Sequence, residues 1–377
     1  MAVALVNGRV LIGRKFVTAQ AVVVEDGRIR DVTAGDLPDD PEVLDLCGHI
    51  LVPGFIDVQV NGGGDRLFND DPSVETIAAI ARTHRQFGTT GFLPTLISDD
   101  SAKIAAAIDA ARTAIAAGVP GVLGVHIEGP FLNPAKKGIH DPTKLRPISN
   151  TDIELLSRPT GGKTVVTLAP EAVPADAIRQ LAAAGVVVSA GHTQATADQV
   201  FEALRNGLRG FTHLFNAMSP LGSREPGVVG AALYDQNSWC GIIADGHHVD
   251  PRVLKIAFRA TALRRFMLVT DAMPSVGGSK SFMLNSEKIS AAGGKCVNAH
   301  GTLAGSDLDM ATAVRNAVTM LGLDLADAAM MASANPATFL GVDHELGRIA
   351  PGMRASLVLL NDQLQVVETW IDGVRGQ

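Results

Sequence analysis

The 377-residue sequence predicts an α/β fold: a TIM (β/α)8 barrel with a small β-sandwich domain formed by both termini. Two observations carry this prediction. Eight apolar, strand-like runs alternate with Ala-rich helical stretches through the middle of the chain, whereas both ends are rich in short strands and turn dipeptides. Eight strands with helical crossovers over roughly 300 residues match the size of a TIM barrel. A strand count cannot prove that the sheet closes, so an open doubly wound sheet is the alternative.

The two ends of the chain share one pattern of short strands separated by turns. The turn dipeptides are Asn7-Gly8, Asp26-Gly27, Asn361-Asp362 and Asp372-Gly373. Such dipeptides favour hairpins between β-branched or alternating runs. We therefore expect residues 1–52 and 350–377 to form one β-sandwich domain, and residues 53–349 to form the catalytic barrel inserted between them.

The middle of the chain supplies the barrel elements. The expected strands are 54–60, 91–97, 121–127, 163–169, 185–190, 210–215, 240–244 and 265–270. Candidate helices between them include 73–88, 101–118, 176–185 and 196–207, each of which ends in Gly, a common residue after a helix C-terminus. The NGGGD segment (61–65) matches no phosphate-binding motif and is interpreted as a flexible loop.

Composition excludes several classes of protein. The net charge is −7, with 39 acidic and 32 basic residues and no run of Lys or Arg, which argues against a nucleic-acid partner. We find neither an export signal nor an apolar run long enough to span a membrane. The three cysteines are widely separated and form no CxxC pair, which argues against a disulfide framework or a thiolate zinc site. A cytoplasmic protein with no membrane partner is expected.

Acidic and imidazole side chains follow several of the expected strands, and in a TIM barrel these strand ends form the active site. Glu128, His192 and His213 each end a different strand, and we assign them as ligands of one divalent metal ion. Two imidazoles and a carboxylate without thiolates suit Zn, Fe or Mn. His126 points the same way on its strand as Glu128 and is the alternative ligand.

Asp271 ends the eighth strand, where its carboxylate could take a proton from a metal-bound water and pass it to a leaving nitrogen. The alternative is that Asp271 serves as the N-cap of a following helix.

The motifs GFIDVQVNGGGD, HIEGPFLN, SAGHT, THLFNAMSPL, SREPG, IIADGHHV, LVTDAM and GTLAGS follow one another in this order. Together they resemble the N-acetylglucosamine-6-phosphate deacetylases of the amidohydrolase superfamily, over a region from about residue 50 to the C-terminus. The resemblance implies a TIM barrel with a β-sandwich, and metal-dependent hydrolysis of the acetamide of N-acetylglucosamine 6-phosphate to glucosamine 6-phosphate and acetate.

The resemblance also implies the roles of individual residues. It gives Glu128, His192 and His213 as metal ligands and Asp271 as the catalytic acid/base. The remaining implied contacts are with substrate: Asn216 and the backbone of Ala217 with the sugar phosphate, Arg224 and His248 with the phosphate, and His140 with the sugar or the acetamide carbonyl. A homodimer is implied, in which the neighbouring subunit can supply either phosphate contact.

One departure concerns the number of metals. Much of the superfamily carries His-x-His after the first strand, where this chain has Gln59-Val60-Asn61. Amides are poor substitutes for imidazole as metal ligands. One divalent ion is therefore expected, zinc first, with iron, manganese or cobalt as alternatives, and a second metal stays open.

Two other functions compete with this hypothesis. One is another amidohydrolase activity, that of a cyclic amidase or imidase, although such enzymes usually carry the two-metal His-x-His and a bridging lysine. The other is a non-catalytic barrel that binds a sugar phosphate. A scaffold has no use for the set Glu128, His192, His213 and Asp271, so this last alternative is disfavoured.

Overall fold

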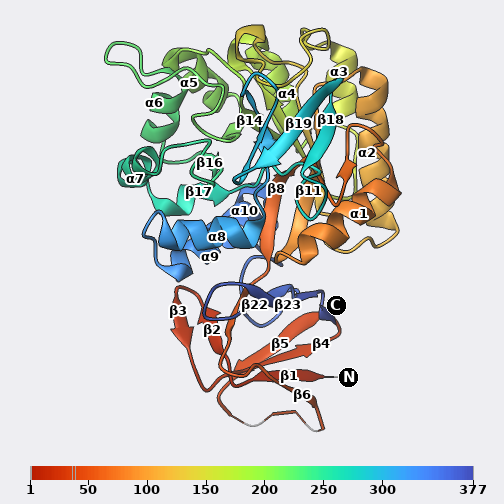
Figure 1. Ribbon diagram of the computed structural model, residues 1–377, viewed down its shortest axis with the longest axis vertical. Helices are drawn as coiled ribbons and strands as arrows, with labels where there is room; N and C mark the ends of the chain where they lie inside the picture. Colours follow the sequence, from red (N-terminus) through yellow and green to blue (C-terminus); the bar gives the residue numbers. More distant parts are fainter. Residues whose placement is uncertain (1, 36, 39, 377) are drawn as a thin grey trace.

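A computed structural model of the chain describes residues 2–35, 37–38 and 40–376. All eight expected barrel strands are present in one parallel sheet, ordered β17-β16-β15-β14-β13-β12-β11-β8 (Figure 1). Their bounds are β8 (Phe55–Val60), β11 (Thr89–Ile97), β12 (Gly124–Glu128), β13 (Lys163–Leu168), β14 (Val187–Ala190), β15 (Leu208–Phe211), β16 (Trp239–Ile242) and β17 (Phe266–Leu268).

The first and last strands of this sheet meet, which favours the barrel over the open sheet. Just beyond β17, the backbone N–H of Asp271 donates to the carbonyl of Gln59 on β8 (3.0 Å). Val60 and Ala272 form a parallel bridge at the same place. The sheet therefore closes into the (β/α)8 barrel, and the carboxyl ends of all eight strands share one rim.

Helices surround the barrel. They are α1 (Val74–Arg85), α2 (Ser101–Ala116), α3 (Asn150–Leu156), α4 (Ala175–Ala183), α5 (Ala197–Arg205), α6 (Gly227–Tyr234), α7 (Pro251–Ala260), α8 (Met310–Thr319), α9 (Leu325–Ala332) and α10 (Ala334–Leu340), with 3₁₀ turns η1 (Pro134–Lys136), η2 (Pro170–Ala172) and η3 (Leu263–Arg265). The four expected helices correspond to α1, α2, α4 and α5. As predicted, glycines with positive φ follow them, for example Gly118 (φ 71°) and Gly185 (φ 86°).

Both termini lie in a small domain of two sheets, at the bottom of Figure 1. One sheet has the order β5-β4-β1-β6 and comes from the N-terminal region; the other, β24-β23-β22-β7-β2-β3, combines both ends of the chain. The bounds are β1 (Val3–Val6), β2 (Arg9–Ile12), β3 (Lys15–Val17), β4 (Ala21–Glu25), β5 (Arg28–Thr33), β6 (Glu42–Asp45), β7 (Ile50–Pro53), β22 (Leu357–Leu360), β23 (Val366–Ile371) and β24 (Val374–Arg375). Leu5 and Val22 of the first sheet and Leu357 and Trp370 of the second belong to one buried cluster, as expected of a β-sandwich.

Three of the four turn dipeptides behave as predicted. Asp26-Gly27 joins the antiparallel pair β4 and β5, and the two C-terminal dipeptides join β22 to β23 and β23 to β24. Asn7-Gly8 is different, because β1 and β2 belong to separate sheets. The chain crosses from one layer of the sandwich to the other at this turn, so the hairpin predicted there is wrong.

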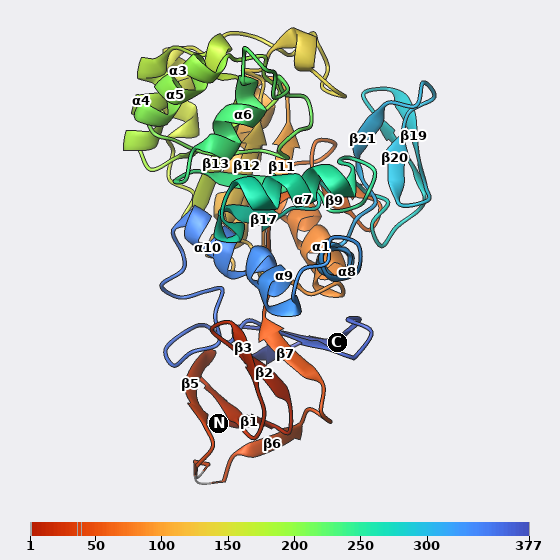
Figure 2. The ribbon, with the colours of Figure 1, turned by 90° about the vertical axis from the view of Figure 1, so that its left-hand side faces the viewer.

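A further sheet, which the sequence pattern did not reveal, follows the eighth barrel strand. It contains β18 (Ser281–Leu284), β19 (Glu287–Ala292), β20 (Lys295–Val297) and β21 (Leu303–Ser306) and stands out from the side of the barrel (Figure 2). The NGGGD segment is likewise ordered: β9 (Gly62–Gly63) pairs with β10 (Arg66–Leu67). A Cβ at Gly63 would lie 2.7 Å from the imidazole of buried His84, so packing fixes this segment and the flexible-loop interpretation is wrong.

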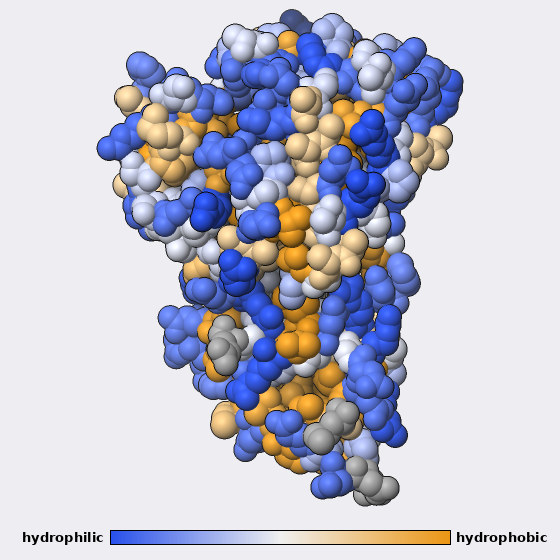
Figure 3. Space-filling model, turned by 90° about the vertical axis from the view of Figure 1, so that its right-hand side faces the viewer, coloured by the Kyte–Doolittle hydropathy of each residue, from blue (hydrophilic) through white to orange (hydrophobic). Residues whose placement is uncertain are grey.

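The surface of the molecule is hydrophilic over most of one side. On the side shown in Figure 3, hydrophilic residues cover most of the barrel, while apolar residues reach the surface near the waist above the small domain. Among the described residues, no helix combines the length and the apolar character needed to cross a membrane.

Candidate active site

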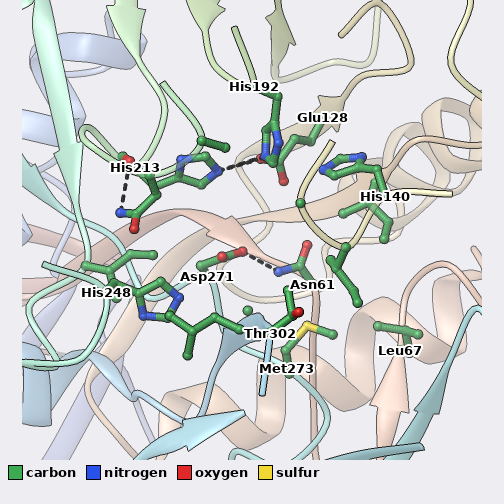
Figure 4. Close-up of a pocket in the computed structure, with 18 of the residues that line it drawn as sticks. Asn61, Leu67, Glu128, His140, His192, His213, His248, Asp271, Met273 and Thr302 are labelled. Atoms are coloured by element: carbon green, nitrogen blue, oxygen red, sulfur yellow. Dashed lines mark hydrogen bonds and ion pairs between the residues drawn. The ribbon is translucent and has the colours of Figure 1, made fainter. Parts of the chain in front are cut away.

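The carboxyl ends of the barrel strands surround a pocket of about 360 Å³ (Figure 4). Most of the residues singled out from the sequence line it: Glu128, His140, His192, His213, Asn216, Ala217, His248 and Asp271. These residues lie far apart in the chain, and closure of the barrel brings them together.

The backbone at three of these strand ends has an unusual conformation. His192, His213 and Asp271 have positive φ angles of 51°, 32° and 52°. Side-chain-bearing residues adopt this region rarely and at a cost, and such residues cluster at functional sites. The turn after each strand therefore directs its side chain into the pocket.

The expected metal ligands converge on one point. Glu128 Oε1 lies 3.0 Å from His213 Nε2 and 3.3 Å from His192 Nε2, and the two Nε2 atoms are 3.1 Å apart. Two donors each about 2.0–2.1 Å from a tetrahedral zinc ion lie about 3.3 Å apart. All three residues are buried, with at most 6% of their surface exposed. The arrangement fits a single divalent cation.

His140 also lies close enough to Glu128 and His192 to be considered as a ligand. Its hydrogen bonds argue against this. The backbone N–H of Ser98 donates to His140 Nδ1 (3.3 Å), and Ser98 Oγ lies 2.7 Å from the same atom. In a neutral imidazole the proton is then on Nε2, which faces the pocket as a donor.

The imidazole of His192 has the opposite arrangement. Its Nδ1 lies 2.8 Å from the carbonyl oxygen of Lys136, so Nδ1 carries the proton and Nε2 presents a lone pair. His192 is thus oriented to bind a cation, whereas His140 is oriented to donate. Burial, together with the nearby His192, lowers the pKa of His140 to about 3, which keeps it neutral near pH 7.

Two side-chain amides hold Asp271. One is Gln59 on β8, and the other is Asn61, which follows β8. Asn61 Nδ2 donates to Asp271 Oδ1 (2.7 Å), and Gln59 Nε2 lies 3.2 Å from the same oxygen and 3.1 Å from Glu128 Oε2. The positions that carry His-x-His elsewhere in the superfamily therefore donate here to the two carboxylates. The sequence argument identified these amides as poor metal ligands but missed their function as donors.

The two carboxylates differ electrostatically. Burial alone would raise the pKa of Glu128, but the hydrogen bonds and charges of His192 and His213 hold it well below its usual range. Burial raises the pKa of Asp271, and the Glu128 carboxylate raises it further. One carboxylate is therefore stabilised as an anion beside the imidazoles, while the other has an increased proton affinity, as a general base requires.

His126, the alternative ligand, lies deeper in the barrel. Its Nε2 is 2.8 Å from Thr167 Oγ1 and its Nδ1 is 3.3 Å from Thr95 Oγ1. Burial lowers its pKa to about 4. Both nitrogens are thus occupied by hydroxyl groups, which favours Glu128 as the ligand from this strand.

The two adjacent histidines occupy different places. His248 lines the pocket, and its Nδ1 lies 2.6 Å from Asp245 Oδ2, which directs Nε2 into the cavity. His247 is exposed, and its Nε2 lies 2.8 Å from the carbonyl oxygen of Gly293 in the turn between β19 and β20. Asn216 and Ala217 also line the pocket, and Asn216 Nδ2 donates to the carbonyl oxygen of His213 (3.2 Å).

Arg224 is the one expected site residue that does not line the pocket. It is exposed on the loop before α6, which projects from the barrel. Its neighbour Glu225 accepts hydrogen bonds from the backbone of Ala197 and Gly227 (2.8 and 2.9 Å). The loop is therefore fixed at Glu225, while Arg224 is exposed and does not reach this chain's own pocket.

Asp271 is followed by a turn, and no helix begins in the described segment between it and β18, so the N-cap alternative is wrong. The added sheet contributes to the pocket wall instead, through Gly301, Thr302, Leu303 and Gly305. These residues belong to the GTLAGS motif. This motif is one of those that resemble the deacetylase family, and it was the one sequence signal that the segment reaches the site.

Comparison with known proteins agrees with the geometry. The amidohydrolase family model matches residues 50–375. The chain is 44% identical to an N-acetylgalactosamine-6-phosphate deacetylase of Shewanella sp. (strain ANA-3), covering 94% of this chain and 90% of that protein. It is 34% identical to an N-acetylglucosamine-6-phosphate deacetylase of Haemophilus influenzae, covering 93% of each chain.

A solved structure shares the whole architecture. The crystal structure of N-acetylglucosamine-6-phosphate deacetylase from Pasteurella multocida superposes with a TM-score of 0.96 at 34% identity and covers 100% of both chains. The fold and the extent of the family match agree, and the chain belongs to the amidohydrolase family.

Proposed function

We propose that this protein hydrolyses the acetamide of N-acetyl-D-glucosamine 6-phosphate to D-glucosamine 6-phosphate and acetate. The observation that carries the proposal is the pocket itself, which combines the Glu128, His192 and His213 cluster with a carboxylate of raised pKa, Asp271. His248 lies across the cavity from the cluster, where a second polar end of a substrate would be held (Figure 4).

Glu128, His192 and His213 would hold one divalent cation, with zinc proposed first because its ligand geometry matches the spacing of these donors. When bound, such an ion lowers the pKa of a coordinated water and polarises an amide carbonyl. Iron, manganese or cobalt would suit the same donors. Gln59 and Asn61 are hydrogen-bonded to carboxylates, which supports a single cation.

Asp271 takes the proton of the attacking water and later delivers it to the amine nitrogen as the C–N bond breaks. Its raised pKa favours the first transfer and allows the group to hold the proton until the amine nitrogen, a stronger base, takes it. Asn61 and Gln59 fix the carboxylate in place through Oδ1, which leaves Oδ2 for the water.

His140 stabilises the oxyanion that develops from the acetamide carbonyl. Its neutral ring, with Nδ1 accepting from Ser98, directs an Nε2–H donor toward the pocket. A donor fixed in advance in a dry site contributes strongly to such stabilisation. His248, together with Asn216 and the backbone of Ala217, would bind the sugar phosphate on the other side.

Arg224 would complete the phosphate site from a second copy of this chain. Its loop lies beside an apolar groove that includes exposed Leu221 (61%), Val253 (38%) and Ile256 (61%). Exposed apolar groups of this size mark interaction surfaces, and a symmetric dimer would bury them. We therefore propose a homodimer in which Arg224 acts in the partner's pocket.

Mixing of two inactive variants tests this arrangement. Chains carrying Arg224→Ala and chains carrying Asp271→Asn would each be impaired alone. If Arg224 acts across the dimer, a mixed dimer contains one pocket with both residues, and mixing restores part of the activity. Absence of any recovery in dimers shown to be mixed would place Arg224 in the pocket of its own chain.

N-acetylgalactosamine 6-phosphate is the second candidate substrate. The relative that is 44% identical is named as a deacetylase of that sugar, which differs from N-acetylglucosamine 6-phosphate in the configuration at C4. The pocket groups assigned above act on the acetamide and the phosphate, which the two sugars share. Comparison of kcat/KM for both sugar phosphates decides which one is preferred.

Acetate release from a panel of N-acetylhexosamines, with and without the 6-phosphate, tests the main proposal. We expect strong dependence on the phosphate, loss of activity after chelation, and recovery on adding a divalent metal. Asp271→Asn should abolish turnover while leaving sugar-phosphate binding nearly intact. Full activity in that variant would refute the mechanism.

A cytoplasmic setting completes the proposal. The three cysteines are free thiols, with Cys47 exposed and the other two buried. Reducing compartments keep such thiols reduced.

A further inference from the structure

A second cavity lies at the other end of the barrel, where the strands begin. It has a volume of about 660 Å³, which is in the range of small-molecule sites, about 300–1,000 Å³. Leu208 and Trp239, the first residues of β15 and β16, line it, as does Arg265, which immediately precedes β17. Helices α5 and α10 supply further walls. The cavity is therefore separate from the pocket at the carboxyl ends of the same strands.

The cavity carries excess positive charge. Arg205, Arg209 and Arg265 line it, and Asp235 is the one carboxylate among its described lining residues. In the described part of the chain, none of these three guanidinium groups forms an ion pair. Arg209 donates instead to two backbone carbonyls of α10, at 2.8 Å each. Three positive charges against one negative charge are unusual in a chain with a net charge of −7.

Asp235 is not available to neutralise the arginines fully. Its Oδ2 accepts hydrogen bonds from the backbone N–H groups of Asn237 and Ser238, at 3.1 and 2.6 Å. Burial lowers the pKa of Arg265, the charges of Arg264 and Arg209 lower it further, and Asp235 opposes them incompletely. The positive charges thus repel one another in the absence of an anion.

Two buried polar atoms at the cavity have no partner among the described residues. One is Oγ of Ser238, a residue that is 3% exposed, and the other is Nε of Arg265. Both atoms lie beneath the cavity surface, out of reach of a ligand bound in it. The groups that can receive an anion are the guanidinium groups of Arg205 and Arg265, which line the cavity.

The cavity also has an apolar side. The Arg265 guanidinium lies over the indole ring of Trp239, 4.9 Å from its centroid, which fixes the orientation of the arginine. Phe201 and Leu204 of α5 contribute further apolar surface. A ligand that combines an anion with an organic group would use both parts.

We propose that this cavity binds a small organic phosphomonoester, with the phosphate held by Arg205 and Arg265 and the organic group against Phe201 and Leu204. Planar guanidinium groups match pairs of phosphate oxygens. This site does not depend on the proposed deacetylase activity, because none of its residues lines the catalytic pocket.

Isothermal titration calorimetry with phenyl phosphate and with inorganic phosphate tests the proposal. The cavity variants are Arg205→Gln, which changes an exposed side chain that has no hydrogen-bond or ion-pair partner among the described residues, and the double variant Arg205→Gln/Arg265→Gln. Arg82→Gln, which changes an exposed arginine on α1, is the matched control. Binding of phosphate in the catalytic pocket is common to all of these proteins and cancels in the comparison.

We expect Arg205→Gln to weaken one phenyl phosphate site by about tenfold, the usual contribution of a charge-assisted hydrogen bond. The double variant should lose that site, so that the stoichiometry falls by one per chain, while Arg82→Gln behaves as the wild type. Unchanged stoichiometry and affinity in the double variant would overturn the proposal. Equal affinity for inorganic and phenyl phosphate would assign the site to free phosphate and overturn the organic part.

Discussion

The two ends of the barrel use charge in opposite ways. At the carboxyl ends of the strands, Glu128 is compensated by His192 and His213, and Asp271 by two amides. At the amino ends, the guanidinium groups have no carboxylate partners in the described part of the chain. A network of hydrogen-bonded carboxylates and imidazoles can transfer protons. Guanidinium groups without carboxylate partners can bind an anion but cannot transfer protons near pH 7. The same eight strands thus support chemistry at one end and recognition at the other.

Removing the charge of Glu128 should have the largest effect on activity of the substitutions that test this contrast. Glu128→Gln should lose the bound metal and lower kcat/KM by at least about 1,000-fold, because an amide binds a divalent cation poorly and leaves two imidazoles without their counter-charge. Metal content per chain and acetate release measure the two effects.

His126→Gln is the matched control on the same strand. His126 contacts two threonine hydroxyls, so this variant should keep its metal and lose mainly stability, by about 1–2 kcal/mol. Loss of metal in His126→Gln with retention in Glu128→Gln would exchange their roles and contradict the assignment.

Asp57, which lies inside the barrel, tests whether charge compensation is confined to the rim. It is fully buried, and burial raises its pKa from 3.8 to about 7. Between these values the folded protein retains a proton that the unfolded chain releases, so the stability contributed by Asp57 is lost as the pH rises toward 7. The decrease in the free energy of unfolding over this pH range is roughly 4 kcal/mol.

Asp57→Asn should remove this pH dependence. Its amide can keep the hydrogen bond with Thr270 without becoming charged. Urea unfolding at pH 4.5 and pH 7.5 should show that the variant becomes more stable than the wild type as the pH rises. An identical pH dependence in both proteins would mean that Asp57 is ionised at no cost in the barrel interior.

The sequence was sufficient to predict the strands and the convergence of Glu128, His192, His213 and Asp271 in one pocket, because apolar runs are local patterns and the polar residues that follow them must meet once the barrel closes. The roles of Gln59 and Asn61 could not be predicted, since they depend on contacts with carboxylates 69 and 210 positions away. The sheet β18–β21 was missed because its short strands lack a strong apolar pattern. The donor role of His140 depends on a backbone N–H at Ser98, which no residue type reveals.

Asn61 provides a smaller test of the carboxyl-end network. Asn61→Ala should lower kcat/KM by about tenfold, because Asp271 loses a 2.7 Å hydrogen bond that stabilises its ionised form. Removing that bond raises the pKa of Asp271 further, so the acid limb of the pH–rate profile should move to higher pH. A uniform loss of activity at every pH would indicate a merely structural role.

The smallest expected effect distinguishes neighbouring residues at the edge of the same network. His248→Ala should raise KM for the phosphorylated substrate by about tenfold with little change in kcat, because its Nε2 faces the pocket and contributes to binding rather than to proton transfer. His247→Ala removes only a contact with the Gly293 carbonyl outside the pocket, and its KM should change by less than about threefold. Equal effects of the two substitutions would mean that the turn between β19 and β20, to which His247 is bonded, is as important for substrate binding as the residue inside the cavity. Substrate binding at the carboxyl ends of the strands would then also depend on the added sheet β18–β21.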